Sequence, residues 1–150
     1  MNPISARPAH RWVRVVLVLL GLPNAMAGAW AVAEPQGWFD RFPGWDPRLV
    51  AADPPYNAHL ATDAGAGLLA SGLVLLAAAW LADRRSIQLA LVAFLAFAIP
   101  HGVFHALHDS PGLSDAQSVQ NAVTLMGSAV VAVVLLIVTT RVSVPRGEPA

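Results

Sequence analysis

Four long apolar stretches limit what this chain can fold into more than any other feature. They cover residues 15–32, 64–82, 87–107 and 122–138, and each is close to the roughly 20 residues that a helix needs to cross about 30 Å of hydrocarbon. A spanning segment should be helical, because its backbone groups find no water inside a bilayer. The sequence therefore predicts an all-α fold, a four-transmembrane-helix antiparallel bundle that forms a single integral membrane domain over residues 1–150.

The residues around these stretches indicate where the helices begin and end. We expect helices over about 12–33, 57–82, 86–108 and 115–140. Asn57 and Ser86 are suited to cap the second and third helices, and Ser114 with Gln117 resembles a capping box for the fourth. The connection at 83–86 is short, so the second and third helices should be antiparallel neighbours.

Composition agrees with a membrane protein and excludes several other classes. Charged residues make up 12% of the chain, about half of the 25% or so found in soluble domains. Nine arginines balance nine acidic residues, so no net positive charge suggests a nucleic-acid partner. The absence of cysteine excludes disulfides and thiolate metal ligands. The expected partner is the lipid bilayer.

The positions of the arginines predict the orientation. One side of a four-helix bundle would carry most of them: Arg7, Arg11, Arg14, Arg84, Arg85, Arg141 and Arg146. The other side would carry only Arg41 and Arg48, outnumbered there by acidic residues. The positive-inside rule then places both termini in the cytoplasm of a multi-pass protein of the cell (plasma) membrane.

The first apolar stretch has a second interpretation. A basic lead-in, a short apolar core, Pro23 and the small residues Ala25 and Ala27 also describe a signal peptide that would be cleaved after residues 1–27. Against this, the apolar character continues to Val32, which gives a length that spans a bilayer.

The segment 34–56 is the longest connection and would face outside. It contains five prolines and the aromatic residues Trp38, Phe39, Phe42, Trp45 and Tyr56. Aromatic rings favour the headgroup layer, so the segment could anchor the protein there. Alternatively, it could form a lid over a site at the outer end of the bundle.

Histidines and one aspartate meet at that outer end in the predicted topology. The run "PHGVFHALHD" places three histidines on one stripe of the third helix, and a second pair lies one turn apart on the second helix. Because these two helices are expected to be antiparallel neighbours, the groups should converge. The candidate metal ligands are His59, Asp63, His101 and His105, with His108 as a further one. Supporting partners could be Asn57, Gln117 and Asn121.

Several chemistries fit such a group. Neutral imidazole ligates transition metals such as Zn, Cu or Fe, whereas haem would need a wider apolar slot. Histidine and aspartate chains also form proton relays in pumps and transporters. The same side chains could instead form hydrogen bonds that only stabilise the bundle, as in a structural or accessory subunit. No residue pattern assigns a catalytic role.

Small residues provide the other pattern. Gly67 and Ser71 match the small-xxx-small spacing that lets membrane helices approach closely. We expect this face to pack within the bundle, while a homo-oligomer or a partner in a membrane complex is the alternative.

The layout resembles the DoxX-like group of small four-helix bacterial membrane proteins. The segments that carry the resemblance are "AVAEP", "DAGAGLLASGLVLLAAAWLADR", "PPYNAHLATDAGAG" and "PHGVFHALH". The resemblance implies a four-helix membrane fold, and some members are associated with quinol oxidation or thiol stress. A thiol role does not carry over, because this chain has no cysteine. The resulting prediction is a polytopic membrane protein whose outer His/Asp cluster binds a transition metal or redox cofactor.

Overall fold

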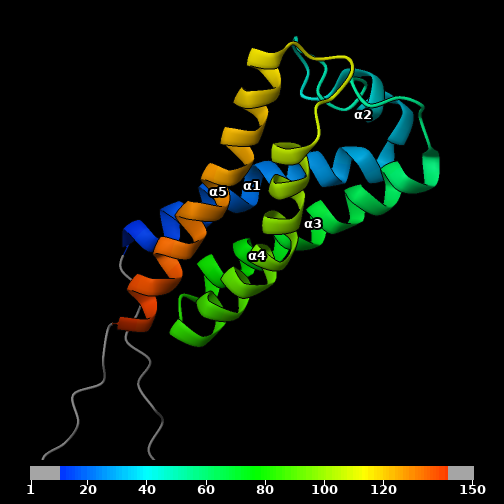
Figure 1. The fold of residues 1–150 in the computed structure, drawn as a ribbon. Helices are drawn as coiled ribbons and strands as arrows, with labels where there is room; N and C mark the ends of the chain where they lie inside the picture. Colours follow the sequence, from blue (N-terminus) through cyan, green and yellow to red (C-terminus); the bar gives the residue numbers. More distant parts are fainter. Residues whose placement is uncertain (1–10, 142–150) are drawn as a thin grey trace, which may run out of the picture.

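The computed structural model describes residues 11–141, which form five helices and no strand (Figure 1). The helices are α1 (Arg11–Ala33), α2 (Pro35–Arg41), α3 (Ala58–Leu81), α4 (Arg84–Leu107) and α5 (Asp115–Arg141). All but α2 are long and apolar enough to cross a membrane. The prediction of an all-helical fold with four helices long and apolar enough to span a membrane is confirmed for residues 11–141. Arg7 and Arg146, two of the arginines used to predict the orientation, lie outside the described residues.

The caps agree with two of the three predicted helix starts. The Asn57 side chain accepts a hydrogen bond from the Leu60 backbone. Ser114 and Gln117 form the predicted capping box, in which the Ser114 N–H donates to Gln117 Oε1 at 2.9 Å. The prediction that Ser86 caps α4 is wrong. The helix begins two residues earlier, and Asp83 caps it by accepting from the Ser86 N–H at 3.0 Å.

Helices α1 and α3 approach each other through glycines. Gly28 lies against Gly65 and Leu69, and Gly21 lies against Gly72. A Cβ added to Gly28 would stand only 2.2 Å from the Leu69 backbone nitrogen, so no side chain fits there. Gly21 and Gly28 are seven residues apart in α1, and so are Gly65 and Gly72 in α3. This spacing keeps one face of each helix turned toward the other helix.

The predicted small residues of α3, Gly67 and Ser71, lie beside α4 and within α3 itself. A Cβ on Gly67 would lie 3.4 Å from the Phe97 ring of α4, so Gly67 faces α4 instead of α1. Ser71 donates its hydroxyl to the Gly67 carbonyl within α3 at 2.8 Å. Gly67 therefore packs within the bundle, as expected, while the closest backbone approach of α3, which is to α1, is made by Gly65 and Gly72.

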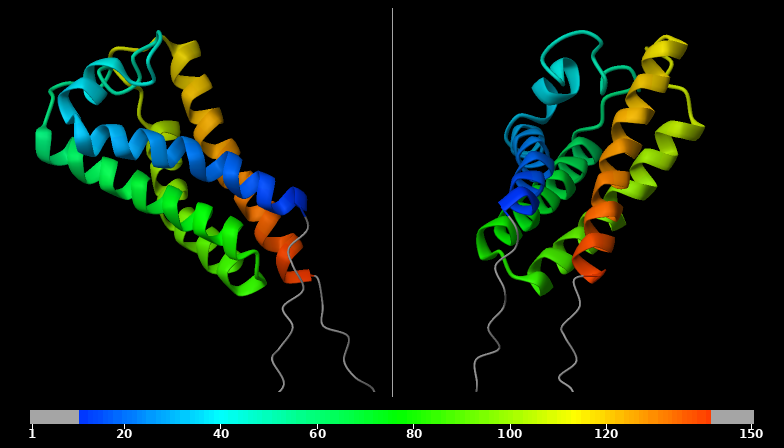
Figure 2. Two further views of the ribbon diagram at one scale, coloured as in Figure 1. Left: turned by 180° about the vertical axis from the view of Figure 1, so that it is seen from behind. Right: turned by 90° about the vertical axis from the view of Figure 1, so that its left-hand side faces the viewer.

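A second helix pair is formed by α4 and α5. Gly102 faces Met126, and at the other end Gln88 Nε2 donates to the Thr139 carbonyl at 3.2 Å. Arg84 Nη2 likewise donates to the Thr140 carbonyl at 2.7 Å. Figure 2 shows α1 with α3 as one layer and α4 with α5 as the other. The core between them includes Leu17, Leu75, Ile87, Leu91, Phe94 and Leu135.

Large apolar side chains also cover the outside of the long helices. The most exposed of them include Leu19, Met26, Leu89, Leu107, Val123 and Val130. A soluble monomer rarely exposes so much contiguous apolar surface, whereas lipid tails accept it without cost. The exposed surface thus fits the interpretation of the four long helices as membrane spans.

Two ends of the bundle are used as reference points below. The arginine end contains the starts of α1 and α4 and the ends of α3 and α5, with Arg11, Arg14, Arg84 and Arg85. The loop end contains the ends of α1 and α4, the starts of α3 and α5, and the connections 34–57 and 108–114.

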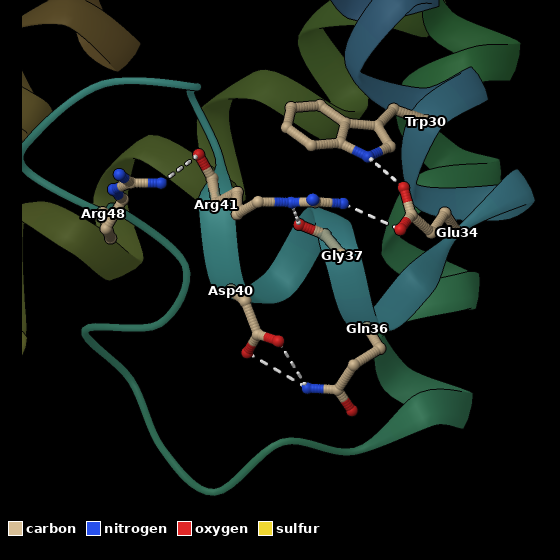
Figure 3. A network of polar contacts seen from close by, with 7 residues as sticks. All are labelled: Trp30, Glu34, Gln36, Gly37, Asp40, Arg41 and Arg48. Atoms are coloured by element: carbon tan, nitrogen blue, oxygen red, sulfur yellow. Dashed lines mark hydrogen bonds and ion pairs between the residues drawn. The ribbon is translucent and has the colours of Figure 1, made fainter.

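The connection after α1 contains a helix that the sequence analysis missed. Pro35 stands at the start of α2, where its missing N–H and fixed φ suit the first helical turn. The indole of Trp38 is buried against Ala31 of α1 and Ala61 of α3. Figure 3 shows the polar side of this segment, where Arg41 Nη2 binds Glu34 Oε1 at 2.7 Å. These contacts make the segment an ordered cap on α1 and α3.

The cap is joined to the α4–α5 connection. Ser110, which is buried, donates its hydroxyl to Asp53 Oδ2 at 3.0 Å. The Gly112 N–H donates to the Ala52 carbonyl at 3.0 Å, and a Cβ on Gly112 would stand 2.7 Å from the Ala52 Cα. The two connections at the loop end therefore hold the two helix layers together there.

Candidate functional site

The histidine stripe on α4 forms a continuous row of rings. His101 stacks on Phe97 with ring centroids 5.3 Å apart, and it forms a T-shaped contact with His105 with centroids 4.9 Å apart. His105 also meets Phe104 edge to face at 5.5 Å. Phe97, His101 and His105 lie four residues apart in succession, so these three rings follow one face of the helix, and Phe104 is the chain neighbour of His105. The row runs from the apolar middle of α4 to the loop end.

His101 and His105 differ from His108 in their surroundings. Both are half-buried, whereas His108 is exposed and stacks on Phe104 at 4.4 Å. His108 Nδ1 also lies 3.0 Å from the Phe104 carbonyl. No hydrogen bond within residues 11–141 involves the rings of His101 or His105. A polar group that is withdrawn from bulk water usually forms a hydrogen bond. The ring nitrogens of His101 and His105 are therefore open to water, a proton or a ligand.

A small cavity of about 50 Å³ borders His101 in the middle of the bundle. Each long helix contributes to its wall: Asn24 from α1, Leu68 from α3, His101 from α4 and Ser128 from α5. Asn24 Nδ2 donates to the Leu20 carbonyl at 2.8 Å, and Ser128 Oγ donates to the Leu125 carbonyl at 2.7 Å. Both side chains keep an oxygen that can accept a further hydrogen bond.

The cavity limits what this site can hold. Its volume suits one water molecule or a comparably small polar group, since a water occupies about 30 Å³ in the liquid. Larger organic ligands require pockets of about 300 Å³ or more. A haem slot beside His101 is therefore not formed in the part of the chain that the structure describes.

The second predicted pair lies at the start of α3. His59 Nε2 and Asp63 Oδ2 are 3.4 Å apart, and their side chains are 82% and 62% exposed. The connection 34–57 therefore does not cover this pair, so it does not form a lid over all of the predicted ligands. The short distance supports an ion pair when His59 is protonated.

The two pairs lie along the same pair of neighbouring helices without forming one group. Gly67 contacts Phe97 across α3 and α4, with Asp63 one turn beyond Gly67 and His101 one turn beyond Phe97. Toward the loop end, however, α3 and α4 diverge (Figures 1 and 2). In residues 11–141 no three His, Cys, Asp or Glu side chains are placed to hold a metal ion together. The prediction that the four side chains form one group is therefore wrong: His59 with Asp63 and His101 with His105 are two separate pairs.

The predicted supporting residues mostly have other roles. Asn57 and Gln117 use their side chains as helix caps, and Asn121 is half-buried on α5. Asn24 and Ser128 were not among the predicted site residues, although both are polar groups within apolar stretches. Their position inside otherwise apolar helices was the available signal, because such groups face protein or a cavity more readily than lipid.

Comparisons with known proteins identify no relative of this chain. No protein-family model matches the chain, and no curated protein or solved structure is significantly similar to it. The resemblance to DoxX-like proteins consequently has no support beyond the layout and the quoted segments. Function must be inferred from the site itself.

Proposed function

We propose that this multi-pass membrane protein binds and passes protons through His101 and His105 in a proton-coupled transport role. The observation that carries the proposal is the state of the two rings. They are neighbours, half-buried, and make no hydrogen bond within the described residues. Histidine is the side chain whose ordinary pKa lies closest to physiological pH, and ionisable groups inside membrane spans mark proton and substrate paths.

The cavity beside His101 supplies the inner part of this site. The oxygens of Asn24 and Ser128 can accept hydrogen bonds from a protonated ring or from a water that bridges to it. His101 lies about 9 Å before the end of α4, from six residues at 1.5 Å each. A proton that reached His101 would thus have entered the apolar layer.

The exposed His59–Asp63 pair supplies the outer part. The pair lies one turn from Gly67, which contacts Phe97 of α4, and Phe97 stacks on His101. Because the two pairs are separate, the proposed sequence is the His59–Asp63 pair, then water between α3 and α4 at the loop end, then His105 and His101. In the orientation favoured by the arginines, protons enter from outside the cell and both termini are cytoplasmic.

Titration of the histidines tests the proposal. Purified full-length protein with ¹³C-labelled histidine is followed by NMR in detergent from pH 5 to pH 8, and His101→Gln, His105→Gln and His108→Gln assign the signals. We expect His101 and His105 to titrate as a coupled pair, so that replacing one changes the midpoint of the other. His108→Gln serves as the matched control and should leave both midpoints unchanged.

Two outcomes would contradict the proposal. Rings that stay neutral throughout this range carry no protons at physiological pH. Titration of His101 that is unaffected by His105→Gln would show that the rings act separately and only pack. If both variants keep the fold and its thermal stability, a purely structural role for the pair is also excluded.

Binding of one transition-metal ion is the second candidate. Two imidazoles at positions i and i+4, with centroids 4.9 Å apart, could share one Zn, Cu or Fe ion. The remaining ligands would have to be water or a partner molecule, given the separate His59–Asp63 pair. Elemental analysis after equilibration with zinc distinguishes the candidates: metal retained by the unaltered chain but lost in His101→Ala favours this one.

A further inference from the structure

A groove of about 470 Å³ lies on the lipid-facing side of α1 and α3 at the arginine end. Its wall combines two arginines, Arg11 and Arg14, with apolar side chains that include Leu19, Leu76 and Trp80. The site is remote from the histidines, which lie toward the loop end. It was not anticipated from the sequence, where the arginines served only to predict orientation.

The charge of the groove is positive and uncompensated by the described part of the protein. Arg14 Nε donates to the Ala79 carbonyl at 2.9 Å, which fixes the guanidinium against α3. No carboxylate of residues 11–141 lies within ion-pair distance of Arg11 or Arg14. Their remaining N–H groups are therefore available to oxygens of an anionic ligand, and guanidinium binds phosphate with two parallel hydrogen bonds.

The position of the groove indicates which phosphate would occupy it. Arg11 begins α1 and Trp80 is 79% exposed near the end of α3, which is the level where tryptophan and arginine meet lipid headgroups. Leu19 lies about 8 Å further along α1 than Arg14, from five residues at 1.5 Å each. The groove is thus cationic at headgroup depth and apolar at the depth of the acyl chains.

We infer that this groove binds one anionic phospholipid from the leaflet at the arginine end. The phosphate would accept hydrogen bonds from Arg11 and Arg14, while an acyl chain would lie along Leu19, Leu76 and Trp80. Basic pockets between membrane helices recognise acidic headgroups in this way. Such a lipid would bridge α1 and α3, independently of the proposed proton pathway.

Native mass spectrometry of the full-length protein tests this inference. The detergent-solubilised protein is titrated with dioleoyl phosphatidylglycerol, with dioleoyl phosphatidylcholine as the zwitterionic arm and inorganic phosphate as the free-anion arm. Each arginine near an anionic headgroup contributes roughly fivefold in affinity. We therefore expect the double variant Arg11→Gln/Arg14→Gln to bind phosphatidylglycerol about 30-fold more weakly, with phosphatidylcholine binding unchanged.

Arg48→Gln is the matched control, because Arg48 lies at the loop end and pairs with Asp46. Equal affinity for both lipids, an equal loss in Arg48→Gln, or phosphate binding as tight as that of phosphatidylglycerol would each overturn the inference. If circular dichroism shows that the double variant has lost helix, the phosphatidylglycerol affinity of the single variant Arg11→Gln is measured instead. Arg11 is exposed, and an unchanged affinity in that variant would also overturn the inference.

Discussion

Replacing Gly28 by alanine should separate α1 from α3, because the contact has no room for even one methyl group. The added Cβ would stand 2.2 Å from the Leu69 nitrogen, 2.6 Å from the Gly65 oxygen and 2.7 Å from the Leu69 Cα. All three are backbone atoms, so no side chain can rotate away. Ordinary contact begins at 3.4 Å, and the helices must therefore move apart by about 1 Å.

The energetic cost follows from that displacement. Overpacking of a close interface costs about 1–3 kcal/mol, and a gap of 0.5–1 Å elsewhere along the interface removes a quarter to a half of each dispersion contact. Alanine recovers up to about 1 kcal/mol through its helix propensity. The free energy of unfolding should thus fall by about 1–2 kcal/mol, which lowers the Tm by about 2–8 °C for a chain of this size.

Thermal unfolding in mild detergent, followed by circular dichroism at 222 nm, measures the effect. Gly127→Ala is the matched control, because a Cβ at Gly127 meets nothing within 4 Å; its Tm should stay the same or rise. Gly67→Ala should also be tolerated, since its Cβ would make ordinary contact with Phe97 at 3.4 Å. The packing account would be refuted if Gly28→Ala unfolded at the same temperature as Gly127→Ala.

Two further predictions concern the core and a helix cap. Leu91 is fully buried and Leu89 is 71% exposed on the same helix, so Leu91→Ala should lower the free energy of unfolding by about 2–5 kcal/mol and Leu89→Ala by much less; equal losses in detergent unfolding would refute the assigned lipid-facing side of α4. Hydrogen bonds with Ser86 hold the pKa of Asp83 below its ordinary value. A lowered pKa means that Asp83 stabilises the fold above about pH 4 and that this contribution is lost as the pH falls through the folded-state pKa. Asp83→Ala should therefore have a lower Tm than the unaltered protein at pH 7, with the difference shrinking in acid, and a difference that grew in acid would contradict the sign.

Hydropathy alone was sufficient to predict the long helices, because each span must be apolar over nearly its whole length. Local chemistry also sufficed at Asn57 and at Ser114 with Gln117, where the cap and its partner are three residues apart in sequence. It failed at the start of α4, where Asp83 and Ser86 are both good caps and Arg84 and Arg85 are compatible with either choice. The short α2 was missed because its stability depends on burying Trp38 against two other helices.

Tertiary contacts explain why the site was only partly predictable. The spacing of His101 and His105 correctly placed them on one face of α4. Their relation to His59 and Asp63 depends on how far α3 and α4 diverge, which no local pattern encodes. The role of Asn24 depends on four helices meeting around one cavity, so sequence could indicate that it faces protein but not what lies opposite.

The coupled titration of His101 and His105 tests the central claim most directly. Histidine NMR on the full-length protein between pH 5 and pH 8 should show both rings gaining protons, with His105→Gln moving the midpoint of His101 and His108→Gln leaving it in place. A His101 ring that remained neutral across this range, or one that ignored the loss of its neighbour at 4.9 Å, would contradict the account.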